Sequence, residues 1–225
     1  WDIETVNPIH PNNKHYAVLN TTNVGAALVN DGHDGIVVRK GEKYNLTIFL
    51  KKLDGAGKVQ VSIVNGSDVL AETTLSGALD WKQCKAVLTA KADCDNARLA
   101  ITPQQAGRIA VDFVSLFPQK TFKNRQNGLR PDLAQLLADM HPKFIRFPGG
   151  CVSHGQGLEN MYRWIYTVGP LWERKQISNI WNYHQSMGLG FYEYFQFCED
   201  IGAEPLPVLP AGVPCQNSSR GGHGQ

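Results

Sequence analysis

Apolar and polar residues alternate with a period of two in the first half of the chain. The run 44–50 places Tyr, Leu, Ile and Leu at every second position, and the run 59–63 does the same with Val, Val and Ile. Such alternation is typical of half-buried strands. Turn signals rich in Gly and Asn separate these runs, and further strands are expected at 82–89, 97–102 and 108–116. This regular spacing predicts a β-sandwich of jelly-roll type over residues 1–117.

From residue 118 onward the apolar period lengthens to that of a helix. Leucines and a methionine recur at helical spacing between Pro131 and Pro142, which predicts a helix over 131–140. An apolar strand follows at 143–147, and after a long loop come a second helix at 191–201 and a second strand at 206–209. Helices that alternate with short apolar strands indicate a parallel α/β fold. Residues 118–225 are therefore predicted to form part of a parallel barrel or sheet.

The first of these strands ends in a Phe-Pro-Gly-Gly turn at 147–150. A rigid proline followed by two residues that can adopt positive φ lets the backbone approach a ligand closely, although the same turn also serves as a plain tight exit from a strand. Arg146 precedes the turn. An inward-facing arginine is costly to bury without a carboxylate, so Arg146 is either a site residue or half of a structural ion pair, and we favour the ion pair.

The loop from Gly149 to Leu189 is long for a compact domain, and such loops are usually functional or contain short helices of their own. Its aromatic residues are candidates for binding carbohydrate, because the C–H groups of a sugar ring pack against an aromatic face. Anchoring the loop to a barrel rim is the alternative for each of them. The six aromatic residues are Tyr162, Trp164, Tyr166, Trp172, Trp181 and Tyr183.

Carboxylates are plentiful in the second half, but none directly follows a predicted strand, where a catalytic carboxylate of a parallel barrel projects. Glu193 and Glu199 fall on the second helix and are expected to be solvated or to cap it. Glu204 is expected to precede its strand, on the side where barrel residues serve stability. The residues alone therefore assign no catalytic acid or base.

Composition excludes several classes of function. The formal net charge is +2 and there is no long basic run, so neither nucleic acid nor a membrane surface is an expected partner. The five cysteines lack C-x-x-C or zinc-finger spacing, and we expect no metal and no cofactor. Cys84 and Cys94 fall in neighbouring predicted strands and are a candidate disulfide. The compartment stays unassigned, with export favoured for a bacterial source.

Several motifs together resemble the α-L-arabinofuranosidases of glycoside hydrolase family 51. They are R-F-P-G-G-C at 146–151, the aromatic run at 162–174, the run from Trp181 to Pro205, and A-G-V-P-C-Q-N-S-S at 211–219. The resemblance covers residues 108–225 and is specific because separate motifs occur in the family's order. More loosely, the first half resembles the carbohydrate-binding-module-like sandwich inserted in many of these enzymes.

The resemblance implies a (β/α)₈ barrel that releases terminal α-L-arabinofuranosyl residues with retention, using two glutamates about 5–5.5 Å apart. The strands expected at 143–147 and 206–209 resemble the second and third of the barrel. In the family the catalytic glutamates end the fourth and seventh strands. The resemblance therefore implies that this chain is an internal fragment without a catalytic pair, and that it is inactive by itself.

The resemblance also implies a set of substrate-binding residues. Cys151 stands where relatives place Asn or Cys near the sugar, and Trp181 matches a tryptophan that lines the arabinose subsite. Gly149 and Gly150 shape the turn beside it. The implied partner is an arabinose-containing polysaccharide or oligosaccharide, such as arabinan or arabinoxylan, and the intact protein can be oligomeric.

Two alternatives remain open at the level of sequence. The chain can be a non-catalytic carbohydrate-binding module with a vestigial barrel remnant, in which case polysaccharide affinity would lie wholly in residues 1–117. The sandwich can also be purely structural, since its aromatic residues Tyr16, Tyr44 and Phe49 are all candidates for the core.

Overall fold

A computed structural model describes residues 1–22, 24–55 and 57–215. The chain divides into two compact units, which are treated separately below. Unit 1 comprises Trp1–Ile9 and Lys14–Leu129, and unit 2 comprises His10–Asn13 and the chain from Arg130 onward.

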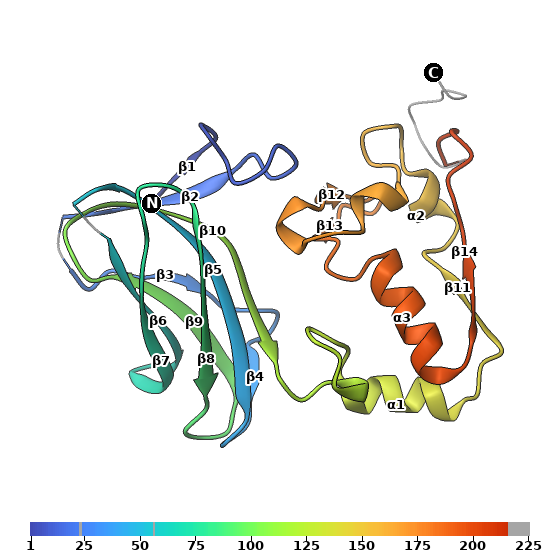
Figure 1. The fold of residues 1–225 in the computed structure, drawn as a ribbon, viewed down its shortest axis with the longest axis horizontal. Coiled ribbons are helices and arrows are strands. Elements are labelled where there is room, and N and C mark those ends of the chain that lie inside the picture. The colour runs from blue at the N-terminus through green and yellow to red at the C-terminus, as the bar shows by residue number, and fades with distance from the viewer. Residues whose placement is uncertain (23, 56, 216–225) are drawn as a thin grey trace. The chain divides into compact units, whose positions relative to one another are not determined.

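Unit 1 is a sandwich of two antiparallel sheets (Figure 1). The first sheet has the order β1-β2-β10-β5-β8 and consists of β1 (Asp2–Glu4), β2 (Tyr16–Thr21), β10 (Gly107–Pro118), β5 (Lys43–Asp54) and β8 (Lys82–Thr89). The second sheet has the order β3-β9-β6-β7, with β4 also paired to β9. Its strands are β3 (Leu28–Asn30), β9 (Cys94–Pro103), β6 (Lys58–Asn65), β7 (Asp68–Ser76) and β4 (Ile36–Val38). The predicted β-sandwich is thereby confirmed.

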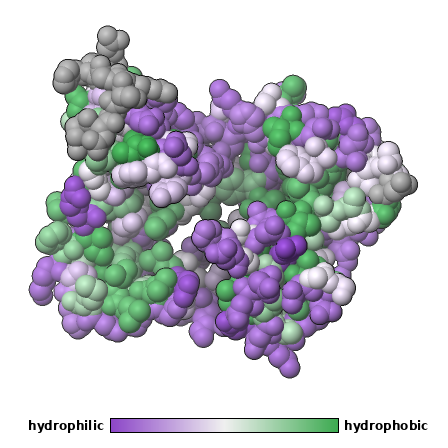
Figure 2. Space-filling model, turned by 180° about the vertical axis from the view of Figure 1, so that it is seen from behind, coloured by the Kyte–Doolittle hydropathy of each residue, from purple (hydrophilic) through white to green (hydrophobic). Residues whose placement is uncertain are grey.

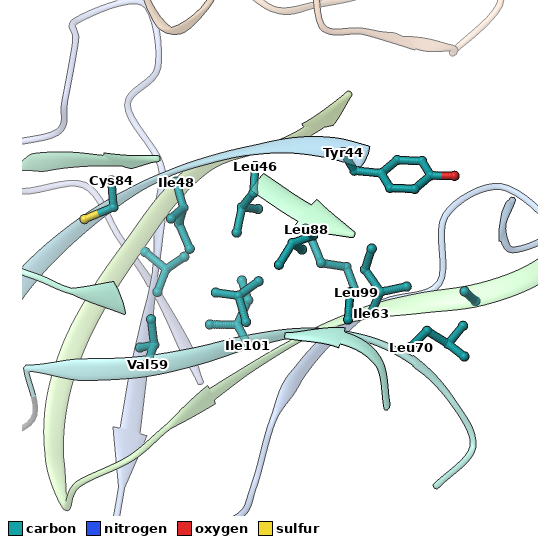
Figure 3. Packing of buried hydrophobic residues seen from close by; sticks show 14 of the residues in the cluster. Tyr44, Leu46, Ile48, Val59, Ile63, Leu70, Cys84, Leu88, Leu99 and Ile101 are labelled. Atoms are coloured by element: carbon teal, nitrogen blue, oxygen red, sulfur yellow. The ribbon is translucent and has the colours of Figure 1, made fainter. Parts of the chain in front are cut away.

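The core of unit 1 lies between the two sheets. Leu46, Ile48 and Leu50 of β5 are fully buried, as are Val59 and the other inward residues of β6. Figure 3 shows these side chains from the two sheets meeting in one apolar layer. The period-two pattern therefore identified the buried face correctly, because successive side chains of a strand point to opposite faces of its sheet.

The three aromatic residues that were candidates for this core are all buried. Tyr44 lies in the layer between the sheets, and Tyr16 belongs to a second, smaller apolar cluster with Val18 and Ala110. The ring of Tyr16 makes an edge contact with Trp81, with centroids 5.1 Å apart. Phe49 is only 8% exposed. These rings are therefore no open platform for a sugar.

The candidate disulfide between Cys84 and Cys94 is not formed. Cys84 lies on β8 in the first sheet and Cys94 on β9 in the second sheet, so the two residues belong to opposite layers of the sandwich. Both are free and buried. The Cys84 thiol lies 3.4 Å from the carbonyl oxygen of Ser76, and the Cys94 thiol lies 3.3 Å from Oδ1 of Asn96.

Unit 2 is built on two parallel strands, β11 (Phe144–Phe147) and β14 (Glu204–Pro207), paired from Phe144 with Glu204 to Phe147 with Pro207. Helix α3 (Phe191–Ile201) precedes β14, and α1 (Pro131–Asp139) precedes β11 (Figure 1). The segment between β11 and α3 has short elements of its own, as its length predicted. They are α2 (Cys151–His154), the 3₁₀ turns Trp164–Tyr166 and Leu171–Glu173, and the two-residue strands β12 (Ile177–Ser178) and β13 (His184–Gln185).

The helices α1 and α3 and the strand β11 lie where they were predicted, within one residue at each end, but β14 begins two residues earlier than expected. The backbone turns at Gly202, which has φ of +71°, and pairing with β11 then starts at once through Glu204 N and Lys143 O, 2.9 Å apart. Glu204 is thus the first residue of its strand and does not precede it. Tertiary pairing, and not local sequence, sets this boundary.

Apolar side chains of unit 2 also lie at its surface. The apolar residues whose helical spacing predicted α1 are exposed. Within α1, the residue that is buried is Ala134. Phe144 on β11 is likewise 58% exposed. Figure 2 shows apolar residues on the surface of this part of the chain. The exposed members of the stripe are Leu133, Leu136, Leu137 and Met140.

Among the described residues, no helix is both long enough and apolar enough to cross a membrane.

Candidate functional site at the strand exits

The exits of the two parallel strands are joined directly. The backbone N–H of Val208, just after β14, donates to the carbonyl oxygen of Phe147 over 2.6 Å. Ser153 on α2 is fully buried, and its hydroxyl donates to Gly149 O over 2.6 Å and lies 3.4 Å from Val208 O. In parallel α/β folds this end of the sheet is where ligands bind.

The Phe-Pro-Gly-Gly turn at 147–150 lies at this junction, and the peptide bond between Phe147 and Pro148 is cis. Gly149 has φ of +128°, a conformation that side chains rarely adopt, whereas Gly150 has an ordinary φ of −85°. The expectation that both glycines can use positive φ is therefore realised only at Gly149. A side chain at residue 150 would begin 3.8 Å from Nη2 of Arg146, an ordinary contact distance.

Arg146 lies beside this turn, and its side chain is exposed. No ion pair of Arg146 occurs within residues 1–22, 24–55 and 57–215, so the structural ion pair that we favoured is not found there. The guanidinium thus lies next to Gly150 with its donors available. Arginine offers five N–H donors in a planar arrangement that suits hydroxyl and carboxylate partners.

Cys151 is the first residue of α2 and is half-buried. The chain after β14 folds back on this short helix, since Nδ1 of His154 lies 2.9 Å from the carbonyl oxygen of Val213 and Cys215 N donates to Gly155 O over 2.9 Å. Gly149, Gly150 and Cys151 are therefore brought together in one turn supported by both strand exits.

Two buried asparagines connect this turn to the segment that carries Trp181. Oδ1 of Asn160 accepts from the N–H of Gln156 over 2.8 Å, and its amide donates to Ser178 O over 3.1 Å. Oδ1 of the next residue, Asn179, accepts from the backbone N–H groups of both Trp181 and Tyr183, at 3.0 and 3.1 Å. Trp181 thereby occupies a turn fixed by hydrogen bonds.

The six aromatic residues of the long loop fall into groups. Tyr162 is 2% exposed and packs against Phe147 and Phe191, so its role is structural, and burial raises the pKa of its hydroxyl. Trp181 is 53% exposed, and Trp164 and Tyr183 are also exposed. Tyr166 and Trp172 are half-buried. Exposed rings are the ones available to a sugar.

A buried ion pair holds the loop to α3, and sequence reasoning missed half of it. Arg174 is 3% exposed and binds Glu193 through two contacts of 2.8 and 2.9 Å. Arg174 also donates to the carbonyl oxygens of Gly169 and Met187. Glu193 in addition accepts from Gly190 N at the start of α3. The capping role expected for Glu193 is confirmed, but it is not a solvated residue.

The strand exits carry no carboxylate. Residues 148–158 and 208–215 contain neither Asp nor Glu, and Glu204 lies at the opposite end of β14. Glu199 is an exposed residue of α3. The described part of the chain also holds no group of three His, Cys, Asp or Glu residues that could bind a metal. Among the residues described, the strand exits thus offer backbone hydrogen-bonding groups and the guanidinium of Arg146, and no pair of carboxyl groups.

Known proteins similar to this chain are α-L-arabinofuranosidases, the enzymes that its motifs resemble. The family model described as Alpha-L-arabinofuranosidase 1 domain matches residues 136–223. An extracellular exo-α-L-arabinofuranosidase of Streptomyces chartreusis is 39% identical over 91% of this chain and 26% of its own length. α-L-Arabinofuranosidase 1 of Arabidopsis thaliana is 39% identical over 84% of this chain and 28% of its own length.

A solved structure is similar to this chain over nearly its whole length. The arabinose-bound MgGH51 α-L-arabinofuranosidase matches 99% of this chain and 37% of its own length, with a TM-score of 0.88 and 30% sequence identity. The matches cover both the sandwich and the strand exits, and the proteins matched are named as α-L-arabinofuranosidases. The chain is a relative of the α-L-arabinofuranosidases of family 51, which confirms the resemblance. It spans roughly a quarter to a third of the length of the curated relatives it matches.

Proposed function

We propose that the protein to which this chain belongs is a retaining α-L-arabinofuranosidase, which releases terminal α-L-arabinofuranosyl residues from arabinan- or arabinoxylan-type polysaccharides and their oligosaccharides. The observation that carries the proposal is the R-F-P-G-G-C turn at the joined exits of β11 and β14, in a chain 39% identical to an exo-acting relative. No nucleic acid, membrane or cofactor enters the proposal.

In this proposal residues 1–117 are the carbohydrate-binding-module-like sandwich, and residues 118–225 provide the second and third strands of a (β/α)₈ barrel. The parallel pairing of β11 and β14 through α3 is the repeat of such a barrel. The exposed stripe of α1 and the exposed Phe144 support the assignment, because these apolar side chains are then buried by further β/α units.

The substrate-binding residues in this chain are Gly149, Gly150, Cys151 and Trp181. Gly149 allows the backbone to bend toward a ligand, and Gly150 presents no side chain at the turn. The exposed ring of Trp181 offers a face to the C–H groups of a furanose. We add Arg146, whose guanidinium next to Gly150 is placed to donate to sugar hydroxyls.

The acid/base and the nucleophile of a retaining glycosidase are two carboxyl groups about 5–5.5 Å apart. Since the strand exits described above hold no Asp or Glu, we assign both groups to other parts of the longer protein. This chain by itself is then inactive, because removing either carboxyl group removes the proton donor or the covalent intermediate.

The test is hydrolysis of 4-nitrophenyl α-L-arabinofuranoside by this chain and by the longer protein, with the product anomer identified by proton NMR. We expect turnover with retention in the longer protein and none in the chain. In the longer protein, Trp181→Ala should raise KM, whereas Trp1→Ala, at an exposed tryptophan of unit 1, is the control and should leave KM unchanged. An inactive longer protein contradicts the function, and turnover by the chain alone contradicts the assignment of the carboxyl pair.

A further inference from the structure

Unit 1 has a polar cavity of about 500 Å³ at one end of the second sheet. It lies between the loop that joins β3 to β4, the tip of the β6–β7 hairpin and strand β9. The polar side chains that line it are those of Asp31, Asp34, Asn65, Asn96 and Arg98. This cavity is part of the sandwich and shares no residue with the strand exits of unit 2.

The loop that carries the two aspartates is closed by its own backbone. Gly35 N donates to Asp31 O over 3.1 Å, and Gly32 N donates to Oδ1 of Asn30 over 2.9 Å. Gly35 has φ of +94°, and a side chain there would begin 2.3 Å from Cα of Asn96 on β9. The backbone of the loop therefore packs closely against β9, which fixes the positions from which Asp31 and Asp34 extend.

Donor and acceptor groups lie side by side in this cavity. Nε of Arg98 lies 3.1 Å from Oδ1 of Asp31, and both side chains are more than half exposed, at 58% and 69%. Two adjacent hydroxyls of a sugar can accept from such a guanidinium and donate to such a carboxylate at the same time. The glycine at the hairpin tip, Gly66, has no heavy atom within 4 Å of the place where a side chain would begin, so access is open there.

The charge and shape of the lining narrow the class of ligand. Two carboxylates against one guanidinium give a net negative lining, which disfavours uronates and phosphates. None of the described residues that line the cavity is aromatic, so these residues offer no stacking platform for an extended chain. A neutral, hydroxyl-rich group matches a lining that offers both hydrogen-bond donors and acceptors.

We propose that this cavity is a binding site for a neutral sugar residue with adjacent free hydroxyls, recognised by the Asp31–Arg98 pair, by Asp34 and by the amides of Asn65 and Asn96. The site is distinct from the strand exits and does not depend on the function proposed above. It would give the sandwich a binding role of its own, through hydroxyl recognition and not through aromatic stacking.

The test is titration of the ¹⁵N-labelled 225-residue chain with L-arabinose, D-xylose and, as the anionic counterpart, D-glucuronate. We expect the neutral sugars to shift amide signals of residues 31–35 and 96–98, and glucuronate to shift them at least tenfold more weakly. Asp34→Asn and Arg98→Gln should each weaken neutral-sugar binding at least tenfold. Arg39→Gln, which removes another exposed Arg–Asp pair reaching β9, should leave it unchanged.

The proposal is overturned if neutral sugars leave these signals unmoved, or if both substitutions leave the affinity intact. A response to Ca²⁺ with none to sugar also overturns it and indicates a cation site instead. Trp181→Ala shows whether these changes come from the cavity or from unit 2. If the sugar binds in the cavity, this substitution leaves the sugar-induced shifts of the amide signals of residues 31–35 unchanged. Asp34→Asn preserves side-chain size, so an otherwise unchanged spectrum shows that a loss of binding is not a loss of folding.

Discussion

The side-chain amide of Asn160 donates to the carbonyl oxygen of Ser178 over 3.1 Å, although the two residues are eighteen positions apart. Because Oδ1 of Asn160 also accepts from Gln156 just after α2, one buried side chain joins the turn of Cys151 to the turn of Trp181. The relative placement of two proposed sugar-binding elements thus depends on a residue that is itself 9% exposed.

Replacing Asn160 by alanine should loosen this connection. It removes the hydrogen bonds to the N–H of Gln156 and to the carbonyl oxygen of Ser178, and each such bond contributes about 0.5–1.5 kcal/mol. Urea unfolding measures the loss of stability, and hydrogen exchange should accelerate at residues 178–183. Gln176→Ala removes an exposed hydrogen bond to His184 and is the control. Equal effects of the two substitutions would show that Asn160 has no special role.

The two glycines of the turn should respond differently to alanine. Gly149→Ala forces a Cβ onto a residue with φ of +128°, and we expect a loss of about 1–3 kcal/mol in the free energy of unfolding. Gly150→Ala should be tolerated, because its φ is ordinary and its Cβ would meet Arg146 at 3.8 Å. Denaturant unfolding of the two variants provides the comparison, and similar losses would contradict the assigned backbone conformations.

Breaking the Arg174–Glu193 pair should destabilise unit 2 strongly. Arg174→Met leaves the carboxylate of Glu193 without its two guanidinium contacts, and removal of one partner of a buried pair costs about 3–5 kcal/mol. Arg174→Lys should recover only part of the loss, since an ammonium cannot form the bidentate contact. Thermal unfolding checks both. Arg39→Gln, at an exposed pair, should leave the melting temperature unchanged, and a comparable drop there would refute the distinction.

Asp112 on β10 should make stability depend on pH. Burial raises the pKa of its carboxyl to about 6, and its Oδ2 is buried without a hydrogen-bond partner. Because the folded pKa lies above the unfolded value, the native state binds more protons between pH 4 and 6. Stability from this group is therefore present below pH 4 and is lost as pH rises through 6. After allowance for solvent screening the effect is on the order of 1–2 kcal/mol.

The measurement is the free energy of unfolding at pH 4.5 and pH 7, for the original chain and for Asp112→Asn. The asparagine keeps the oxygen that accepts from Phe113 N over 2.7 Å but cannot titrate. We expect the original chain to gain stability relative to the variant as pH falls. A pH-independent difference would show that Asp112 titrates as an ordinary exposed carboxyl.

Sequence patterns were most informative where local spacing and burial coincide. The alternation at 44–50 located β5 and its buried face, because that strand lies between a filled core and an outer face. Helix α3 was found in full, from Phe191 to Ile201, since an apolar periodicity ends there at a glycine with positive φ. The Phe-Pro-Gly-Gly turn was correctly placed at a strand exit.

The errors came from contacts between distant residues. The early start of β14 is set by pairing with β11, and Cys84 and Cys94 fall on different sheets although their strands are consecutive. Arg174 gave no signal in the sequence, because its partner Glu193 is nineteen residues away in a different element. Spacing along the chain carries no information on such pairs.

The junction at the strand exits also constrains the order of folding. β11 and β14 are paired through Phe144 and Glu204, which are sixty positions apart (204 − 144), so closing this loop costs about 4 kcal/mol of chain entropy. Helices and short turns inside the loop involve only near neighbours and need no such closure. We expect pulse-labelled hydrogen exchange to show Val208 N–H protected later than α3. The surface that would meet the sugar is then the last part of unit 2 to form.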